Sequence, residues 1–124
     1  MPRRPRVLIA EDHAGLAKAV GRLLALDCDV LENVADGSAV LEAAQRLQPD
    51  VIVIDLNLPK INGLEACRRI VQANPAAKVI MFSAMTDADV LQRSVEAGAS
   101  AFVSKLEDNG TLLSTIKRLH DDRG

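Results

Sequence analysis

The stretch VIVIDLNLPKING, residues 51–63, decides the fold of this chain. Four branched apolar residues run directly into Asp55. A near-continuous apolar run of this kind is typical of a parallel strand that is buried on both faces of a sheet. An acid at the end of such a strand either opens a turn or is held rigidly at a working site. The surrounding sequence has to distinguish these two interpretations.

Strand-like and helix-like segments alternate along the whole chain. Helical spacing of apolar residues predicts a helix after each strand, and the fourth helix is expected to turn Val90, Leu91 and Val95 toward the core. Asp36-Gly37 is one of several turn signals that interrupt the pattern. Five strand–helix units predict an α/β fold with one doubly wound parallel sheet. The predicted strands are 6–11, 30–35, 51–55, 78–83 and 101–105.

The composition is that of one ordinary globular domain. The 124 residues are 48% hydrophobic and 26% charged, which suffices for a single core. We expect a flexible tail at 1–5, a domain at 6–120 and a second tail at 121–124. His120, near the polar end of the chain, is expected to face solvent.

Several classes of function are disfavoured by the same composition. The net charge of −2 and the lack of Trp and Tyr argue against nucleic-acid binding. Because no apolar run approaches the roughly 20 residues of a membrane span and no signal peptide is visible, we expect a cytoplasmic protein without membrane contact. Cys28 and Cys67 lack metal-site spacing, so they are expected to be buried free thiols.

Polar residues stand at the carboxyl ends of four predicted strands. Glu11 and Asp12 end the first strand, Asp55 the third, Ser83 the fourth and Lys105 the fifth. In a doubly wound sheet, ligands bind beyond the carboxyl ends of the strands. Each residue alone is ordinary turn chemistry. Their joint occurrence predicts one site with three carboxylates, a hydroxyl and an ammonium group.

Such a site suits phosphoryl chemistry. Three carboxylates held together repel one another unless a cation joins them, and oxygen ligands suit a hard ion such as Mg²⁺. Asp55 can then act as a carboxylate nucleophile that forms an acyl phosphate. Phosphoryl transfer needs mainly positioning and charge stabilisation. Lys105 offers a point charge to the phosphate oxygens, and Ser83 offers a hydroxyl donor.

The whole set resembles a response-regulator receiver domain of two-component signalling, and the resemblance covers about residues 6–120. It implies a flavodoxin-like (βα)5 fold with strand order 2-1-3-4-5. It makes Asp55 the phosphoacceptor. It also implies Mg²⁺ (or Mn²⁺) as the cofactor, held by Glu11, Asp12, Asp55 and the backbone carbonyl of Asn57.

The resemblance also gives roles to residues around the acceptor. Ser83 and Lys105 would bind the phosphoryl group, and Phe102 occupies the aromatic switch position. Pro59 and Gly63, in the loop after the acceptor, would set the loop geometry. In this family the phosphoryl group draws the hydroxyl inward and the aromatic ring follows. That movement repacks the face made by the fourth helix, the fifth strand and the fifth helix.

The function implied by the resemblance is a switch that takes its phosphoryl group from a sensor histidine kinase. Leu106, where the family often has proline, and the sequence Glu11-Asp12-His13 are similar to NarL/LuxR-type receivers, which usually precede a helix-turn-helix domain. We therefore expect control of transcription through an effector domain that these residues lack, and no DNA binding by this domain. A homodimer, if one forms, would use the face that repacks. Met85 cannot orient a water molecule, so slow self-hydrolysis is expected rather than enzymatic turnover.

Three other functions are less compatible with this sequence. A phosphatase of the haloacid-dehalogenase type needs a second Asp two residues after the nucleophile, and Asn57 stands there. A flavodoxin-like cofactor binder would repel phosphate through Glu11 and Asp12. A degenerate receiver that binds partners without phosphate remains open only through Leu106.

Overall fold

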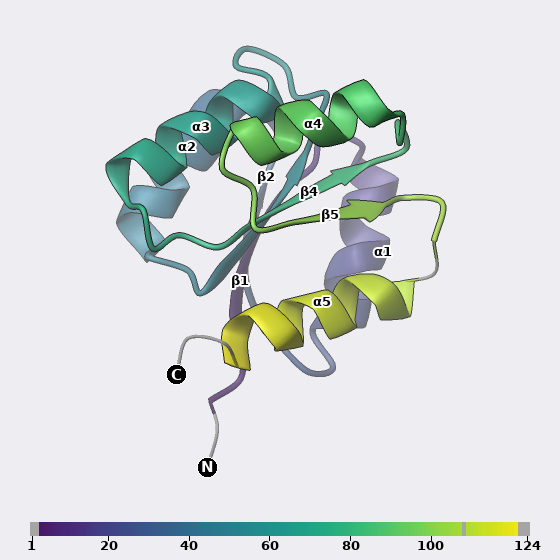
Figure 1. Cartoon of the computed structure of the whole chain (residues 1–124). Helices are drawn as coiled ribbons and strands as arrows, with labels where there is room; N and C mark the ends of the chain where they lie inside the picture. The colour runs from purple at the N-terminus through teal and green to yellow at the C-terminus, as the bar shows by residue number, and fades with distance from the viewer. Residues whose placement is uncertain (1–2, 108, 122–124) are drawn as a thin grey trace.

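The chain folds into one parallel sheet of five strands covered by helices (Figure 1). A computed structural model describes residues 3–107 and 109–121. The strand order is β2-β1-β3-β4-β5, which confirms the predicted doubly wound topology. The strands are β1 (Arg6–Ala10), β2 (Asp29–Val34), β3 (Val51–Asp55), β4 (Val79–Ser83) and β5 (Ala101–Ser104). The helices are α1 (Ala14–Leu24), α2 (Gly37–Leu47), α3 (Gly63–Ala73), α4 (Ala88–Glu96) and α5 (Asn109–Asp121).

Alternation along the strands divides the core into two layers. Successive strand residues point to opposite faces of a sheet. In β1, Leu8 and Ala10 pack with α2, α3 and α4, whereas Val7 and Ile9 pack with α1 and α5. Figure 1 shows these two groups of helices on opposite sides of the sheet. Within the described residues, no helix is long and apolar enough to cross a lipid bilayer.

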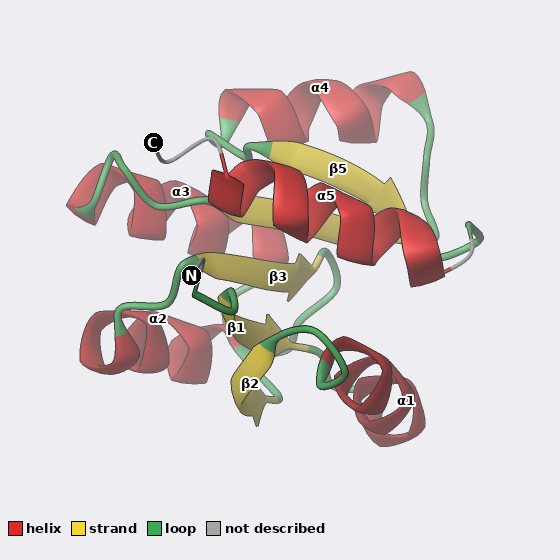
Figure 2. Cartoon of the chain, turned by 90° about the horizontal axis from the view of Figure 1, so that it is seen from below, coloured by secondary structure: helices red, strands yellow, loops and turns green. Residues whose placement is uncertain are grey.

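The central position of β3 explains the apolar run that precedes Asp55. All five residues of β3 are buried, because β1 and β4 pair with it on either side and helices cover both faces. The pairing is parallel throughout the sheet. The carboxyl ends of the strands therefore meet at one edge, as the arrowheads of β3 and β5 show in Figure 2.

The prediction for α4 was wrong at two residues. Val90 is buried as expected, but the side chains of Leu91 and Val95 are 40% and 69% exposed. The row of α4 that faces the sheet contains Val90 and Ser94 instead. Ser94 can be buried because its hydroxyl donates a hydrogen bond to the carbonyl of Val90 at 2.9 Å. Leu91 and Val95 lie outside this buried row, so α4 exposes an apolar pair.

His120 is mostly shielded from solvent, which contradicts the prediction that it faces solvent. Its side chain is only 14% exposed, and its Nδ1 lies 3.8 Å from Oδ2 of the buried Asp50. Its Nε2 lies 3.2 Å from the carbonyl oxygen of Arg3. Arg4 donates hydrogen bonds to the turn between α1 and β2, and Pro5 is buried. Residues 3–5 thus contact the domain, while the division into tails and domain stays a prediction.

The two cysteines are buried free thiols, as predicted. Burial raises the pKa of the Cys67 thiol to about 11. Burial, reinforced by the negative charge of Asp27, also raises the pKa of Cys28. Because the thiolate is the reactive form, we expect iodoacetamide at pH 8 to label neither thiol rapidly in the native protein. In guanidinium chloride both should react at the rate of a free thiol, and mass spectrometry over time separates the two cases. Rapid native labelling would contradict the burial.

Candidate functional site

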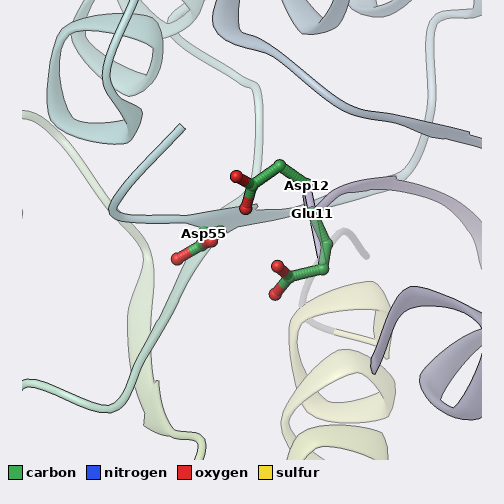
Figure 3. A group of neighbouring side chains, drawn as sticks. All are labelled: Glu11, Asp12 and Asp55. Atoms are coloured by element: carbon green, nitrogen blue, oxygen red, sulfur yellow. The ribbon is translucent and has the colours of Figure 1, made fainter. Parts of the chain in front are cut away.

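Three carboxylates gather at the carboxyl ends of β1 and β3 (Figure 3). Glu11 and Asp12 directly follow β1, and Asp55 is the last residue of the adjacent strand β3. One carboxylate oxygen from each residue lies within 4.8 Å of the others. Glu11 and Asp55 are buried, with exposed fractions of 3% and 5%, while Asp12 is exposed. The structure therefore brings the three predicted acids together.

Lys105 joins this cluster from the end of β5. Its Nζ lies 2.7 Å from Oε1 of Glu11 and 3.3 Å from Oδ1 of Asp55. Burial alone would lower the pKa of this ammonium group, but hydrogen bonding to Glu11 and the negative charge of Asp55 outweigh it and raise the pKa. Lys105 is therefore a permanent positive charge between the two buried carboxylates.

Phe82 supports the same ammonium group and was missed from the sequence. Nζ of Lys105 lies 5.6 Å from the centre of the Phe82 ring, a distance at which the ring attracts a cation. The ring comes from β4, one residue before Ser83. The available signal in the sequence was an aromatic residue directly before Ser83. Within an apolar strand, however, such a residue cannot be distinguished from an ordinary core residue.

The charge of the cluster fits a divalent cation. Three carboxylates and one ammonium group leave a formal charge of −2. Oε1 of Glu11 is buried and lies 2.7 Å from the ammonium group of Lys105, which compensates only one of the three negative charges. An all-oxygen donor set with excess negative charge suits a hard ion such as Mg²⁺. A role for the carbonyl of Asn57 stays a prediction.

Backbone groups orient the two buried carboxylates. Oε2 of Glu11 accepts a hydrogen bond from the backbone N–H of His13 at 3.0 Å. Oδ1 of Asp55 accepts one from the backbone N–H of Asn57 at 3.2 Å. His13 is exposed and caps α1, with its Nδ1 accepting from the N–H of Leu16. Each carboxylate is thus tied to the loop that follows its own strand.

Ser83 and Phe102 lie on the β4–β5 side of the acids. Ser83 ends β4 one residue beyond Phe82, which is the register partner of Asp55. Its buried hydroxyl oxygen accepts a hydrogen bond from the N–H of Met85 at 3.0 Å. Phe102 is half-buried in β5 and packs against the core layer of α2, α3 and α4. A switching role for either residue stays a prediction.

The loop after Asp55 closes on itself through Gly63. The N–H of Gly63 donates to the carbonyl of Leu56 at 2.9 Å. A Cβ atom at position 63 would lie 2.2 Å from the carbonyl oxygen of Asp55, so only glycine fits. The carbonyl of Pro59 accepts a hydrogen bond from the N–H of Gly37, at the start of α2. Both predicted loop residues therefore make specific backbone contacts.

Leu106 does not introduce an unusual peptide bond after Lys105. The described residues contain no cis peptide bond. The N–H of Leu106 donates to the hydroxyl of Ser104 at 3.0 Å, and its side chain is exposed. Leucine is therefore accommodated at this position with an ordinary backbone.

Known proteins resemble this chain in sequence. The sequence profile of the response regulator receiver domain matches residues 7–117. The transcriptional regulatory protein DegU of Brevibacillus brevis is 32% identical over 90% of this chain and 48% of its own length. The DNA-binding response regulator MtrA of Mycolicibacterium paratuberculosis is 31% identical over 96% of this chain and 54% of its own. The chain thus spans about half the length of these relatives.

A solved structure agrees with these sequence matches. A two-component response regulator of the LuxR family from Aurantimonas sp. SI85-9A1 superposes with a TM-score of 0.92 at 28% identity. The match covers 97% of this chain and 87% of that chain. The fold, the acidic cluster at the strand ends and the sequence matches agree: the chain belongs to the response regulator receiver domain family.

Proposed function

We propose that this receiver domain is a phosphoacceptor switch in which Asp55 takes a phosphoryl group from a sensor histidine kinase. The observation that carries the proposal is the position of Lys105, whose Nζ lies between Glu11 and Asp55 at the carboxyl edge of the sheet. Asp55 stands at the end of a rigid buried strand, and a fixed positive charge lies beside it. This arrangement supplies a nucleophile and a group that stabilises phosphate oxygens.

The transfer conserves atoms and charge. A carboxylate oxygen of Asp55 attacks the phosphorus atom, and the bond from phosphorus to the donor breaks. That bond is P–N for a phosphohistidine donor and P–O for acetyl phosphate. The donor leaves with the bonding electron pair, and Asp55 becomes an acyl phosphate. Lys105 compensates charge on the phosphoryl oxygens, and the Ser83 hydroxyl donates a hydrogen bond to one of them.

Mg²⁺ or Mn²⁺ is the cofactor of this proposal. Glu11, Asp12, Asp55 and the backbone carbonyl of Asn57 would hold it. When bound, the ion supplies the two positive charges that the cluster lacks and polarises the phosphoryl group.

The conformational change caused by phosphorylation would be transmitted to partners through the face made by α4, β5 and α5. Ser83 moves toward the phosphoryl group, and Phe102 follows it. The exposed Leu91 and Val95 on α4 give this face an apolar surface for an effector domain or a second copy of the chain. Both curated relatives are named as transcriptional or DNA-binding regulators, which supports an output in transcription through a further domain. We place the protein in the cytoplasm and assign this domain no DNA contact.

The domain would act as a switch and not as a phosphatase. Asn57, two residues after the acceptor, carries an amide group, which cannot act as a general acid toward a leaving group. Its side-chain amide lies 3.9 Å from the sulfur atom of Met85. Neither side chain is a general base for an attacking water molecule. The acyl phosphate would therefore be hydrolysed slowly.

The direct test is the intact mass of the protein after incubation with acetyl phosphate and Mg²⁺. We expect one phosphoryl adduct, which should be absent with EDTA and absent from the Asp55→Asn variant. Asp89→Asn is the matched control, because it removes the carboxylate of an exposed acid. Asp50→Asn is unsuitable as a control because Asp50 is buried. An adduct that persists in Asp55→Asn would overturn the assignment of the acceptor.

A further inference from the structure

The first turn of α2 is pressed against the loop that follows the acceptor. The N–H of Gly37 donates to the carbonyl oxygen of Pro59 at 3.1 Å. A Cβ atom at position 37 would lie 1.9 Å from the carbonyl oxygen of Ile61 and 2.6 Å from its carbonyl carbon. These neighbours are backbone atoms and cannot rotate away. Only glycine lets the two segments approach so closely.

A second contact joins the same two segments. Asp36 caps α2 by accepting a hydrogen bond from the N–H of Ala39 at 2.8 Å. Its other oxygen lies 3.5 Å from Nζ of Lys60. The hydrogen bond from Ala39, helped by the charge of Lys60, lowers the pKa of Asp36, so this carboxylate stays ionised. Lys60 itself has a φ of +68°, a left-handed conformation that non-glycine residues rarely adopt.

These contacts are linked to the site by the acceptor loop, which is the segment between Asp55 and Gly63. The loop begins at Asp55 and is closed by the hydrogen bond from Gly63 to Leu56. Near its start, the N–H of Asn57 holds Oδ1 of Asp55. A shift of Pro59 or Ile61 therefore moves the backbone that orients the acceptor carboxylate and carries the Asn57 carbonyl. Groups that orient ligands in this way control metal affinity from outside the coordination shell.

We propose that Gly37 is a positioning residue for the metal and phosphoryl site, and that Asp36 and Lys60 complete a clamp between α2 and the acceptor loop. The clamp touches neither metal nor phosphoryl group. It fixes the path of the loop, and the loop fixes Asp55 and the Asn57 carbonyl. This inference rests on the proposed function, because it assigns a role within that same site.

The test compares Gly37→Ala with two control variants. Gly21→Ala makes the same chemical change in α1, where an added Cβ meets no atom within 4 Å. Leu24→Ala opens a cavity on α1 at a fully buried position in the other core layer, which contains no residue of the loop, so it matches a loss of stability without touching the clamp. Binding of Mn²⁺ alone is measured by the electron paramagnetic resonance of the free ion, since the chain has no Trp or Tyr for fluorescence.

We expect Gly37→Ala to weaken Mn²⁺ binding roughly 10-fold or more, while both controls stay within about 2-fold of wild type. Equal affinities in all four proteins would overturn the proposal, because α2 would then have moved instead of the loop. An equal weakening in Gly37→Ala and Leu24→Ala would also overturn it, since general loss of stability would explain both.

Variants of the exposed Lys60 test the loop without risk to the core. Lys60→Gly can keep a φ of +68°, whereas Lys60→Pro cannot, because proline fixes φ near −65°. We expect Lys60→Pro to lose about 10-fold in Mn²⁺ affinity and Lys60→Gly to lose much less. Similar affinities for the two would refute control by the loop path.

Phosphorylation of the same proteins by acetyl phosphate separates the two proposals. A wild-type protein that binds Mn²⁺ but gains no phosphoryl group would overturn the proposed function and leave the clamp to be judged by metal affinity. A wild-type protein that is phosphorylated, beside a Gly37→Ala variant with unchanged affinity and unchanged rate, would overturn the clamp alone.

Discussion

Replacement of Lys105 by Met is expected to lower the free energy of unfolding by about 3 kcal/mol and to abolish phosphorylation by acetyl phosphate. Breaking a buried ion pair by removing one partner costs about 3–5 kcal/mol, because the other charge stays buried without compensation. Lys105 contacts two such charges, Glu11 at 2.7 Å and Asp55 at 3.3 Å. Its own side chain is 17% exposed, which places the expected loss at the lower end of that range.

The loss should depend on divalent cations. In wild type the three carboxylates and Lys105 carry a formal charge of −2, and in Lys105→Met they carry −3. We therefore expect Mg²⁺ to bind the variant more tightly and to restore more stability than it adds to wild type. Urea unfolding followed by far-ultraviolet circular dichroism, with and without Mg²⁺, measures both effects. Phosphorylation should not return, because Mg²⁺ does not replace the ammonium group beside the phosphoryl oxygens.

The double variant Lys105→Met/Glu11→Gln separates charge from packing. If uncompensated charge causes the loss, removing the charge of Glu11 should recover most of the stability. Arg69→Met is the matched control, since it removes an exposed cation that pairs with Glu65 on α3 and should cost under about 1 kcal/mol. A stability of Lys105→Met within about 0.5 kcal/mol of wild type would mean that the buried carboxylates need no partner.

Local pattern was sufficient to predict the sheet and the acidic cluster. Strands buried on both faces are apolar at every position, and β3 and β4 follow that rule. Once the strands are parallel, their carboxyl ends must share one edge. Asp55 and Lys105 are 50 residues apart, yet the parallel direction of β3, β4 and β5 places them at the same edge.

Side-chain detail was less predictable, because it depends on tertiary neighbours. The apolar spacing of α4 fits Leu91 and Val95 as well as Val90, but the packed helix buries the row with Val90 and Ser94. His120 lies in a polar segment of the sequence, which predicted exposure to solvent, but the fold places it beside the buried Asp50. The contact of Gly37 with Ile61 joins the first turn of α2 to the loop after Asp55, and a turn signal at Asp36-Gly37 gives no information about the partner segment.

Replacement of Gly63 by Ala is expected to lower the free energy of unfolding by about 3 kcal/mol, the upper end of the usual cost of overpacking. The added Cβ would lie 2.2 Å from the carbonyl oxygen of Asp55 and 2.9 Å from the Cα of Leu56. Both are backbone atoms at the end of a fully buried strand, so no side-chain rotation relieves the contact. Either β3 or the start of α3 has to move.

Gly21→Ala is the matched control for this prediction, because the same glycine-to-alanine change at position 21 should raise the free energy of unfolding instead of lowering it. Gly21 lies within α1 with open space around it, and alanine in a helix is favoured over glycine by about 0.5–1 kcal/mol. Urea unfolding should therefore show one variant below wild type and the other slightly above it. A Gly63→Ala variant as stable as wild type would mean that α3 can withdraw from β3 freely. The hydrogen bond from residue 63 to Leu56 would then not hold the acceptor loop closed. Loss of stability together with weaker Mn²⁺ binding would instead locate the constraint at the acceptor itself, since the displaced atom is the carbonyl of Asp55.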